Sequence, residues 1–147
     1  VKLNPSYPEA HNSLGQAQVH SGKYAEAEPH FNKAIELNPL DTNAIIYKDG
    51  LFFTHMGLGN FEIAYSLIQE CVAQFSEAGF YKGFRASVMG YLNKGTEAKE
   101  ALYEYLALRP NLKKKSDYKK IFVPNSTLAD ILIEGLVRAG WQPEEEG

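Results

Sequence analysis

The stretch GKYAEAEPHFNKAIELNP, residues 22–39, decides the fold of this chain. Its small residues Ala27 and Ala34 lie two helical turns apart, on the same face as the Phe31 between them. A glycine opens the stretch and Pro39 closes it, and proline cannot donate the next backbone hydrogen bond of a helix. The stretch therefore predicts a helix over about 24–37 whose contact face carries small side chains.

The same spacing returns twice further along the chain. GNFEIAYSLIQECVAQFS (59–76) and NKGTEAKEALYEYLALRP (93–110) align with the first stretch, so that Ala27, Ala64 and Ala98 coincide. A period of this length is typical of architectures in which each repeat stacks on its neighbours. The alignment predicts repeats over 8–41, 45–78 and 79–112. Their six helices are expected at about 7–20, 24–37, 43–56, 60–75, 79–92 and 95–108.

The small residues at these positions allow paired helices to pack closely. Two antiparallel helices approach closely only where one of them presents a small side chain at the crossing, and Gly15 and Ala27 do so in the first pair. In the later repeats Phe52 and Tyr105 stand where a small residue is expected. These two residues are therefore predicted to wedge their helix pairs apart.

The residues Leu14, Gly15, Tyr24, Ala27, Phe31, Ala34 and Pro39 together resemble the tetratricopeptide repeat, a helix-turn-helix unit. The resemblance implies an all-α, right-handed α-solenoid of about three such repeats, and it implies protein binding in a concave groove. Since Leu3-Asn4-Pro5 repeats Leu37-Asn38-Pro39, residues 1–7 are predicted to be the tail of a preceding repeat. Val1 is accordingly expected to be an internal residue, and the solenoid end at residues 1–7 to be a surface for self-association.

In this family the first helix of each repeat lines the concave face, which binds a peptide or a partner helix. A core role stays open for Phe53, Phe80 and Phe84, and an apolar ligand held by Phe53, Met56 and Tyr91 is favoured. No lysine or arginine of the first two repeats faces the groove and Asp49 would repel a carboxylate, which argues against a clamp for acidic chaperone tails. Helical spacing places ten residues on this face: Asn12, Gln16, His20, Asp49, Phe53, Met56, Phe80, Phe84, Ser87 and Tyr91.

Residues 113–125 form a predicted basic connector after the repeats. Five lysines fall within 113–120. Such a run is either a solvated connector or a patch for nucleic acid or acidic lipid, and the sequence favours the connector because aromatic and arginine support is sparse.

The last segment, 126–147, is predicted to be a capping helix over 126–139 followed by a frayed tail. Thr127 to Asp130 reads as a capping box and Gly140 as the stop signal. This segment also resembles the carboxyl ends of bacterial multidomain regulators, which join such repeats to class III cyclase or winged-helix domains. That resemblance implies an alternative function, a regulatory or sensor segment of a signalling protein that acts intramolecularly or by self-association.

Nothing in the sequence indicates catalysis, a cofactor or a metal site. The net charge of -3 argues against nucleic-acid binding, and no apolar run is long enough to span a membrane. The four histidines lack zinc-ligand spacing, and Cys71 occupies the position of a buried small residue. The predicted function is thus non-catalytic and cytoplasmic, with a protein or peptide as partner.

Overall fold

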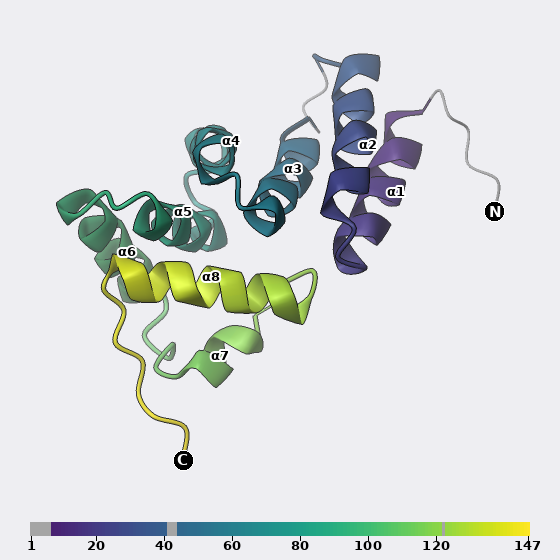
Figure 1. Ribbon diagram of the computed structural model, residues 1–147. Helices are drawn as coiled ribbons and strands as arrows, with labels where there is room; N and C mark the ends of the chain where they lie inside the picture. Colours follow the sequence, from purple (N-terminus) through teal and green to yellow (C-terminus); the bar gives the residue numbers. More distant parts are fainter. Residues whose placement is uncertain (1–6, 41–43, 122) are drawn as a thin grey trace. The chain divides into compact units, whose positions relative to one another are not determined.

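The computed structural model describes residues 7–40, 44–121 and 123–147. Each predicted helix of the repeats is present, with ends within two residues of the prediction, and no extended strand occurs in these ranges (Figure 1). The predicted all-α class of helix-turn-helix units is therefore confirmed. The helices are α1 (Pro8–His20), α2 (Tyr24–Leu37), α3 (Ala44–Leu58), α4 (Phe61–Gln74), α5 (Gly79–Tyr91), α6 (Thr96–Leu108), α7 (Lys115–Lys119) and α8 (Ser126–Ala139).

The chain divides into two compact bodies, Val1–Cys71 and Val72–Gly147. We call them the N-terminal body and the C-terminal body. The division falls within α4, inside the second predicted repeat, rather than between two repeats. The predicted tail of a preceding repeat at residues 1–7 lies, apart from Tyr7, outside the described residues.

Phe31 is the centre of the N-terminal body. Its side chain is fully buried, and its ring lies against Gly15 of α1 and Gly50 of α3. A methyl group added at Gly15 would come within 2.8 Å of the ring. The two glycines therefore create the space that lets α2 pack against both α1 and α3.

The small residues that define the repeat lie where the sequence predicted. Ala27, Ala34 and Ala64 are completely buried, and Ala98 is nearly so. The predicted wedge at Tyr105 is wrong, because this side chain is buried against Gly83 of the facing helix α5. In this pair the small residue is Gly83 of α5 and not a residue of α6, so α5 and α6 stay in close contact.

Four helices, α1, α3, α5 and α8, end in the same turn. At the end of α1, the Gly22 amide donates to the Val19 carbonyl and the Lys23 amide to the Gln18 carbonyl, a Schellman motif. Gly22 has a φ of +75°, which a residue with a side chain adopts at a cost. Asn93 supplies the same left-handed turn after α5, with a φ of 54°. The predicted breaks between paired helices and the predicted stop at Gly140 are thus confirmed.

Two predictions for the C-terminal segment are wrong. The helix α8 is capped by Asn125, whose side chain accepts a hydrogen bond from the Leu128 amide at 2.8 Å, and not by a box that starts at Thr127. The tail is not frayed, because the Glu144 amide donates to the Lys113 carbonyl at 2.7 Å. The connector also contains the short helix α7.

No helix in the described parts of the chain combines the length and the apolar character that crossing a bilayer requires.

Candidate functional site

The ten residues predicted for the concave face differ widely in exposure. In the N-terminal body Asn12, Gln16 and Asp49 are half-buried and His20 is exposed. Phe80 of the C-terminal body is 40% exposed, so it is no core residue. These residues keep some exposed surface, although the Oδ1 atoms of Asn12 and Asp49 are buried, and their role in binding stays a prediction.

The other aromatic and apolar members of the predicted face lie inside the protein. Every residue over 51–56 of α3 and over 86–90 of α5 is buried, so both helices are enclosed on nearly all sides along these stretches. Phe53 and Phe84 are core residues, the alternative that the sequence left open. Met56 and Ser87 are buried as well, which removes Met56 as an accessible apolar anchor for a ligand.

The face of α5 predicted to bind a partner already carries a helix of the same chain. The Ser87 hydroxyl donates to the Leu132 carbonyl at 2.8 Å, and the Tyr91 hydroxyl donates to the Ile131 carbonyl at 2.6 Å. Both acceptors belong to α8, which runs beside α5 (Figure 1). Two of the four residues predicted for the third repeat thus hold a helix in place.

The contact between α5 and α8 is close enough to bring two backbones together. A methyl group added at Gly90 would collide with the Gly135 carbonyl, and one added at Gly135 would collide with Ser87. The Arg138 guanidinium also lies 4.8 Å from the centre of the Tyr91 ring, a cation–π contact. The sequence carries a faint signal for this contact, since small residues recur at helical spacing in both helices.

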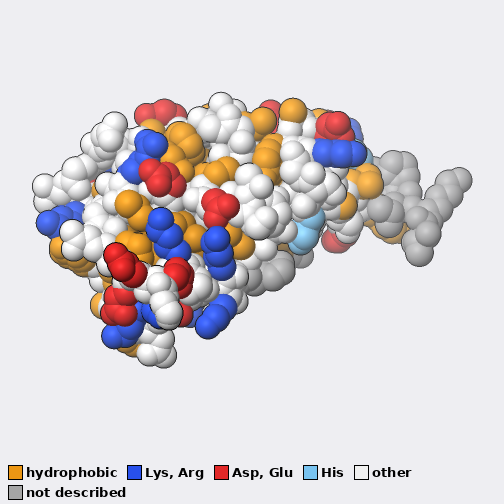
Figure 2. All heavy atoms as spheres, turned by 60° about the horizontal axis from the view of Figure 1, so that its bottom comes forward, with side chains coloured by type: hydrophobic (Ala, Val, Ile, Leu, Met, Phe, Trp, Pro, Cys, Tyr) orange, Lys and Arg blue, Asp and Glu red, His pale blue; other side chains and the backbone are white. Residues whose placement is uncertain are grey.

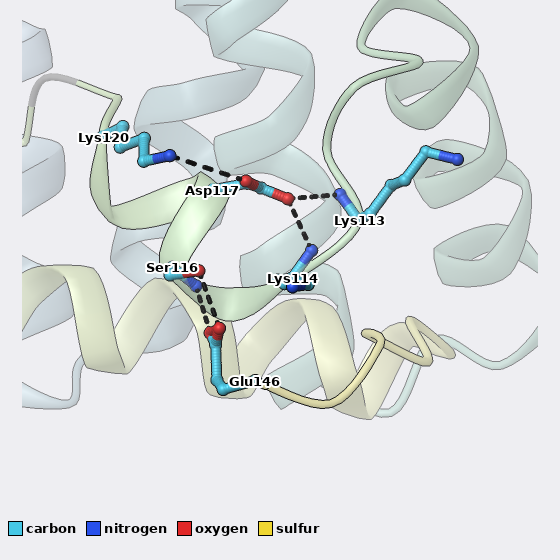
Figure 3. A network of polar contacts seen from close by, with 6 residues as sticks. All are labelled: Lys113, Lys114, Ser116, Asp117, Lys120 and Glu146. Atoms are coloured by element: carbon cyan, nitrogen blue, oxygen red, sulfur yellow. Dashed lines mark hydrogen bonds and ion pairs between the residues drawn. The ribbon is translucent and has the colours of Figure 1, made fainter.

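Two carboxylates, Asp117 of the connector itself and Glu146 of the tail, accept hydrogen bonds from the basic connector. The Asp117 carboxylate accepts hydrogen bonds from the Lys113 and Lys114 amides at 3.0 and 2.8 Å, and Ser116 donates through its amide and its hydroxyl to Glu146, each at 2.8 Å (Figure 3). These hydrogen bonds lower the pKa of both carboxyl groups.

The surface around the connector is of mixed sign. Lys119 pairs with Asp130 of α8 at 3.3 Å, and Lys120 lies 4.0 Å from Asp117. On the face shown in Figure 2, Lys and Arg side chains are interspersed with Asp and Glu side chains. Interspersed charges of both signs favour the solvated connector over a patch for phosphate groups, and that choice stays a prediction.

Cys71 is a buried packing residue, as its place in the repeat predicted. Its thiol is completely enclosed, and burial, helped by Asp49 and Glu70, raises its pKa to about 12. The thiolate needed for nucleophilic chemistry is therefore absent at neutral pH. In the described parts of the chain, no group of three or more His, Cys, Asp or Glu side chains is arranged to hold a metal ion.

We expect the Cys71 thiol to resist a thiol reagent in the folded chain and to react with it once the chain is unfolded. Both its burial and its raised pKa oppose attack. The rate of labelling by an aromatic disulfide reagent, measured with and without denaturant, checks this. Rapid labelling of the native chain would contradict the enclosed position.

His55 is a buried histidine of α3 with two polar neighbours, Glu28 of α2 and Asn60 in the turn after α3. Its Nε2 lies 3.1 Å from a Glu28 carboxylate oxygen, and its Nδ1 lies 3.2 Å from the Asn60 amide nitrogen. Since the Asn60 nitrogen can only donate, Nδ1 accepts and the proton sits on Nε2, which donates to Glu28. Burial lowers the pKa of His55, although the Glu28 carboxylate opposes this shift.

The stability of the chain should therefore decrease as the pH falls below about 6.5, the usual pKa of an unfolded histidine. Between this value and the lower pKa of folded His55, the unfolded chain binds more protons, which favours unfolding. Melting temperatures between about pH 7.5 and pH 5.5 check the effect. A His55→Gln variant should show a shallower dependence, and an identical slope for both proteins would exclude His55 as the source.

Comparison with known families gives one match. Residues 8–40 match the family model described as the tetratricopeptide repeat. The match covers nearly the whole first predicted repeat and supports a tetratricopeptide repeat protein, a class whose repeats generally mediate protein–protein interaction. No curated protein and no solved structure matches the chain. The resemblance of the C-terminal segment to bacterial regulators stays a prediction.

Proposed function

We propose that this chain is a non-catalytic protein-interaction module that binds a peptide or a partner helix on the inner face of its first helices. The observation that carries the proposal is the position of α8, whose backbone is held by Ser87 and Tyr91 of α5. The face that the repeat pattern assigns to partners is thus chemically able to hold a helix. The match to an interaction repeat over 8–40 supports the same function.

In the N-terminal body, the inner face favours a ligand that donates hydrogen bonds. Asn12 and Asp49 occupy equivalent positions in the first and second repeats, on helices that are in contact. The buried Oδ1 atom of Asn12 accepts no hydrogen bond from the described residues. Residues 1–71 carry four lysines, no arginine and eight acidic residues, a net charge of -4. A basic or amide-rich peptide fits this face, whereas the buried Phe53 and Met56 offer no apolar anchor.

The proposal is tested with peptides selected from a random phage-displayed library on the intact chain. Their affinity is then measured by fluorescence anisotropy against Asp49→Asn and against Glu36→Gln. Both changes remove one negative charge, but Glu36 is 73% exposed on α2 and is no part of the predicted face. Since a hydrogen bond to a charged group contributes about 1.5–3 kcal/mol, Asp49→Asn should weaken binding about 10- to 100-fold and Glu36→Gln far less.

A selected peptide that binds both variants as tightly as the wild type would refute the inner face as the binding site. Circular dichroism of each variant guards against loss of folding as the cause of weaker binding. Failure to select any peptide at all would argue against a peptide-binding function.

The intramolecular position of α8 favours a second candidate, in which the chain is a regulatory or sensor segment of a larger bacterial signalling protein, such as an adenylate cyclase or a transcription regulator. In that role the segment acts intramolecularly or through self-association. Light scattering over a wide range of protein concentration tests the second mode, and a constant monomer mass would exclude it.

A further inference from the structure

We infer that the face of α5 is a binding site for one kind of helix, an apolar helix with small residues at the positions of Gly135 and Ala139, and that α8 is its resident occupant. A partner helix of this kind competes with α8 for the face. The inference rests on the proposed interaction function and specifies the chemistry of the partner for the C-terminal body.

The side-chain hydrogen bonds from α5 to α8 end on the main chain of α8. Ser87 and Tyr91 donate to main-chain carbonyl oxygens of α8, at Leu132 and Ile131, and not to side chains. A carbonyl oxygen has a second lone pair, so it accepts such a bond while it remains in its own helix. Every helix presents carbonyl groups, and α5 therefore recognises an element that a partner helix can supply equally well.

Small residues at the contact between α5 and α8 select among helices. The backbones meet at Gly90 and Gly135, where a methyl group on either helix would collide with the other. Ala139, one turn further along α8, is buried beside Gly90. A helix with a larger residue at either position of α8 cannot approach closely enough for Ser87 and Tyr91 to reach its carbonyls.

The apolar side chains of α8 follow a regular spacing. Leu128, Leu132 and Leu136 are completely buried within the C-terminal body and recur at every fourth residue. The resident helix thus combines buried leucines with backbone carbonyls that accept from α5 and small residues at the closest approach. A matching partner helix therefore carries a leucine at every fourth position. On the adjacent face it carries a glycine and, four residues later, an alanine.

The segments that flank α8 hold it through buried as well as exposed contacts, since Tyr118 of α7 and Trp141 after α8 are buried. The Lys119–Asp130 ion pair is more than half exposed on both sides, and the bonds from Ser116 to Glu146 lie at the surface. Exposed ion pairs contribute little free energy. A partner helix also lacks the tether of α8, which gives an effective concentration on the order of millimolar. A change that weakens α8 should therefore open the face to a competitor.

Trp141 makes the test direct. It is the only tryptophan of the chain, it follows α8 immediately, and it is 5% exposed. Its emission therefore reports whether α8 is docked. In the full chain, Gly135→Leu should shift this emission to longer wavelength while circular dichroism retains most of the helix signal.

The competitor is a fluorescein-labelled synthetic peptide of residues 124–142 with tryptophan replaced by phenylalanine. By anisotropy, it should bind the Gly135→Leu chain saturably and the wild-type chain at least tenfold more weakly. The matched control is the same peptide with Gly135→Leu, which should not bind. Should Gly135→Leu prevent folding, Leu136→Ala weakens α8 through a cavity instead of a clash.

Three results would overturn the inference: a released α8 without peptide binding, equal binding of the control peptide, or no variant that releases Trp141. None of them touches the N-terminal body. If the α8 peptide fails while a selected ligand remains sensitive to Asp49→Asn, the inference falls and the proposed function stands.

Discussion

Replacing Phe31 by alanine should lower the free energy of unfolding by about 3–5 kcal/mol, the usual cost of removing a buried phenylalanine ring. The ring is fully buried and fills the space left by Gly15 and Gly50, so its removal opens a cavity between three helices at once. The backbone of two helices would have to move to close it. Urea denaturation followed by circular dichroism measures the change.

Ile63→Ala is the control for this prediction. Ile63 is an apolar residue of α4, but its side chain is 48% exposed. The control should cost far less than the loss of Phe31, because little buried surface and no cavity are involved. Similar losses for both variants would mean that Phe31 is not the residue that joins α1, α2 and α3.

The second large effect is expected for Gly90→Ala, which should destabilise the C-terminal body by about 1–3 kcal/mol through overpacking. The added methyl group meets the backbone of Gly135, where no flexible side chain can move aside. This loss should exceed the gain of about 1 kcal/mol that alanine brings to a helix interior. Thermal unfolding monitored through Trp141, which is buried at the end of α8, provides the measurement.

Gly79→Ala is the matched control, since it is the same substitution in the same helix. There the added methyl group would lie 3.5 Å from a Leu108 methyl, an ordinary contact. Gly79→Ala should leave stability unchanged or raise it slightly. If both variants behave alike, the close approach of α5 and α8 does not hold in solution.

The helices of the repeats could be predicted well because their signals are local. Phe31 and the alanines around it repeat at helical spacing, and the turns at Gly22 and Asn93 depend only on neighbouring residues. The cap of α8 was misassigned because Asn125, Ser126 and Thr127 are all capable of capping. Which of them caps the helix depends on where the first turn of α8 begins, and it begins at Ser126.

The candidate site was harder to predict because its contacts are distant in the sequence. Ser87 and Leu132 are 45 residues apart, and Ser116 and Glu146 are 30 apart. Repeat alignment assigns Ser87 and Tyr91 to an inner face, but it contains no information about what covers that face. The burial of Phe53 and Met56 could not be predicted for the same reason, because it depends on the elements that surround α3.

The separation of 45 residues between Ser87 and Leu132 also has a consequence during synthesis. A ribosome that adds about 5–20 residues per second needs roughly 2–9 s to proceed from one residue to the other. Throughout this interval the nascent chain carries α5 without α8. Under the competition inferred above, a partner helix should therefore bind more readily during synthesis than after it, because no tethered α8 is yet present.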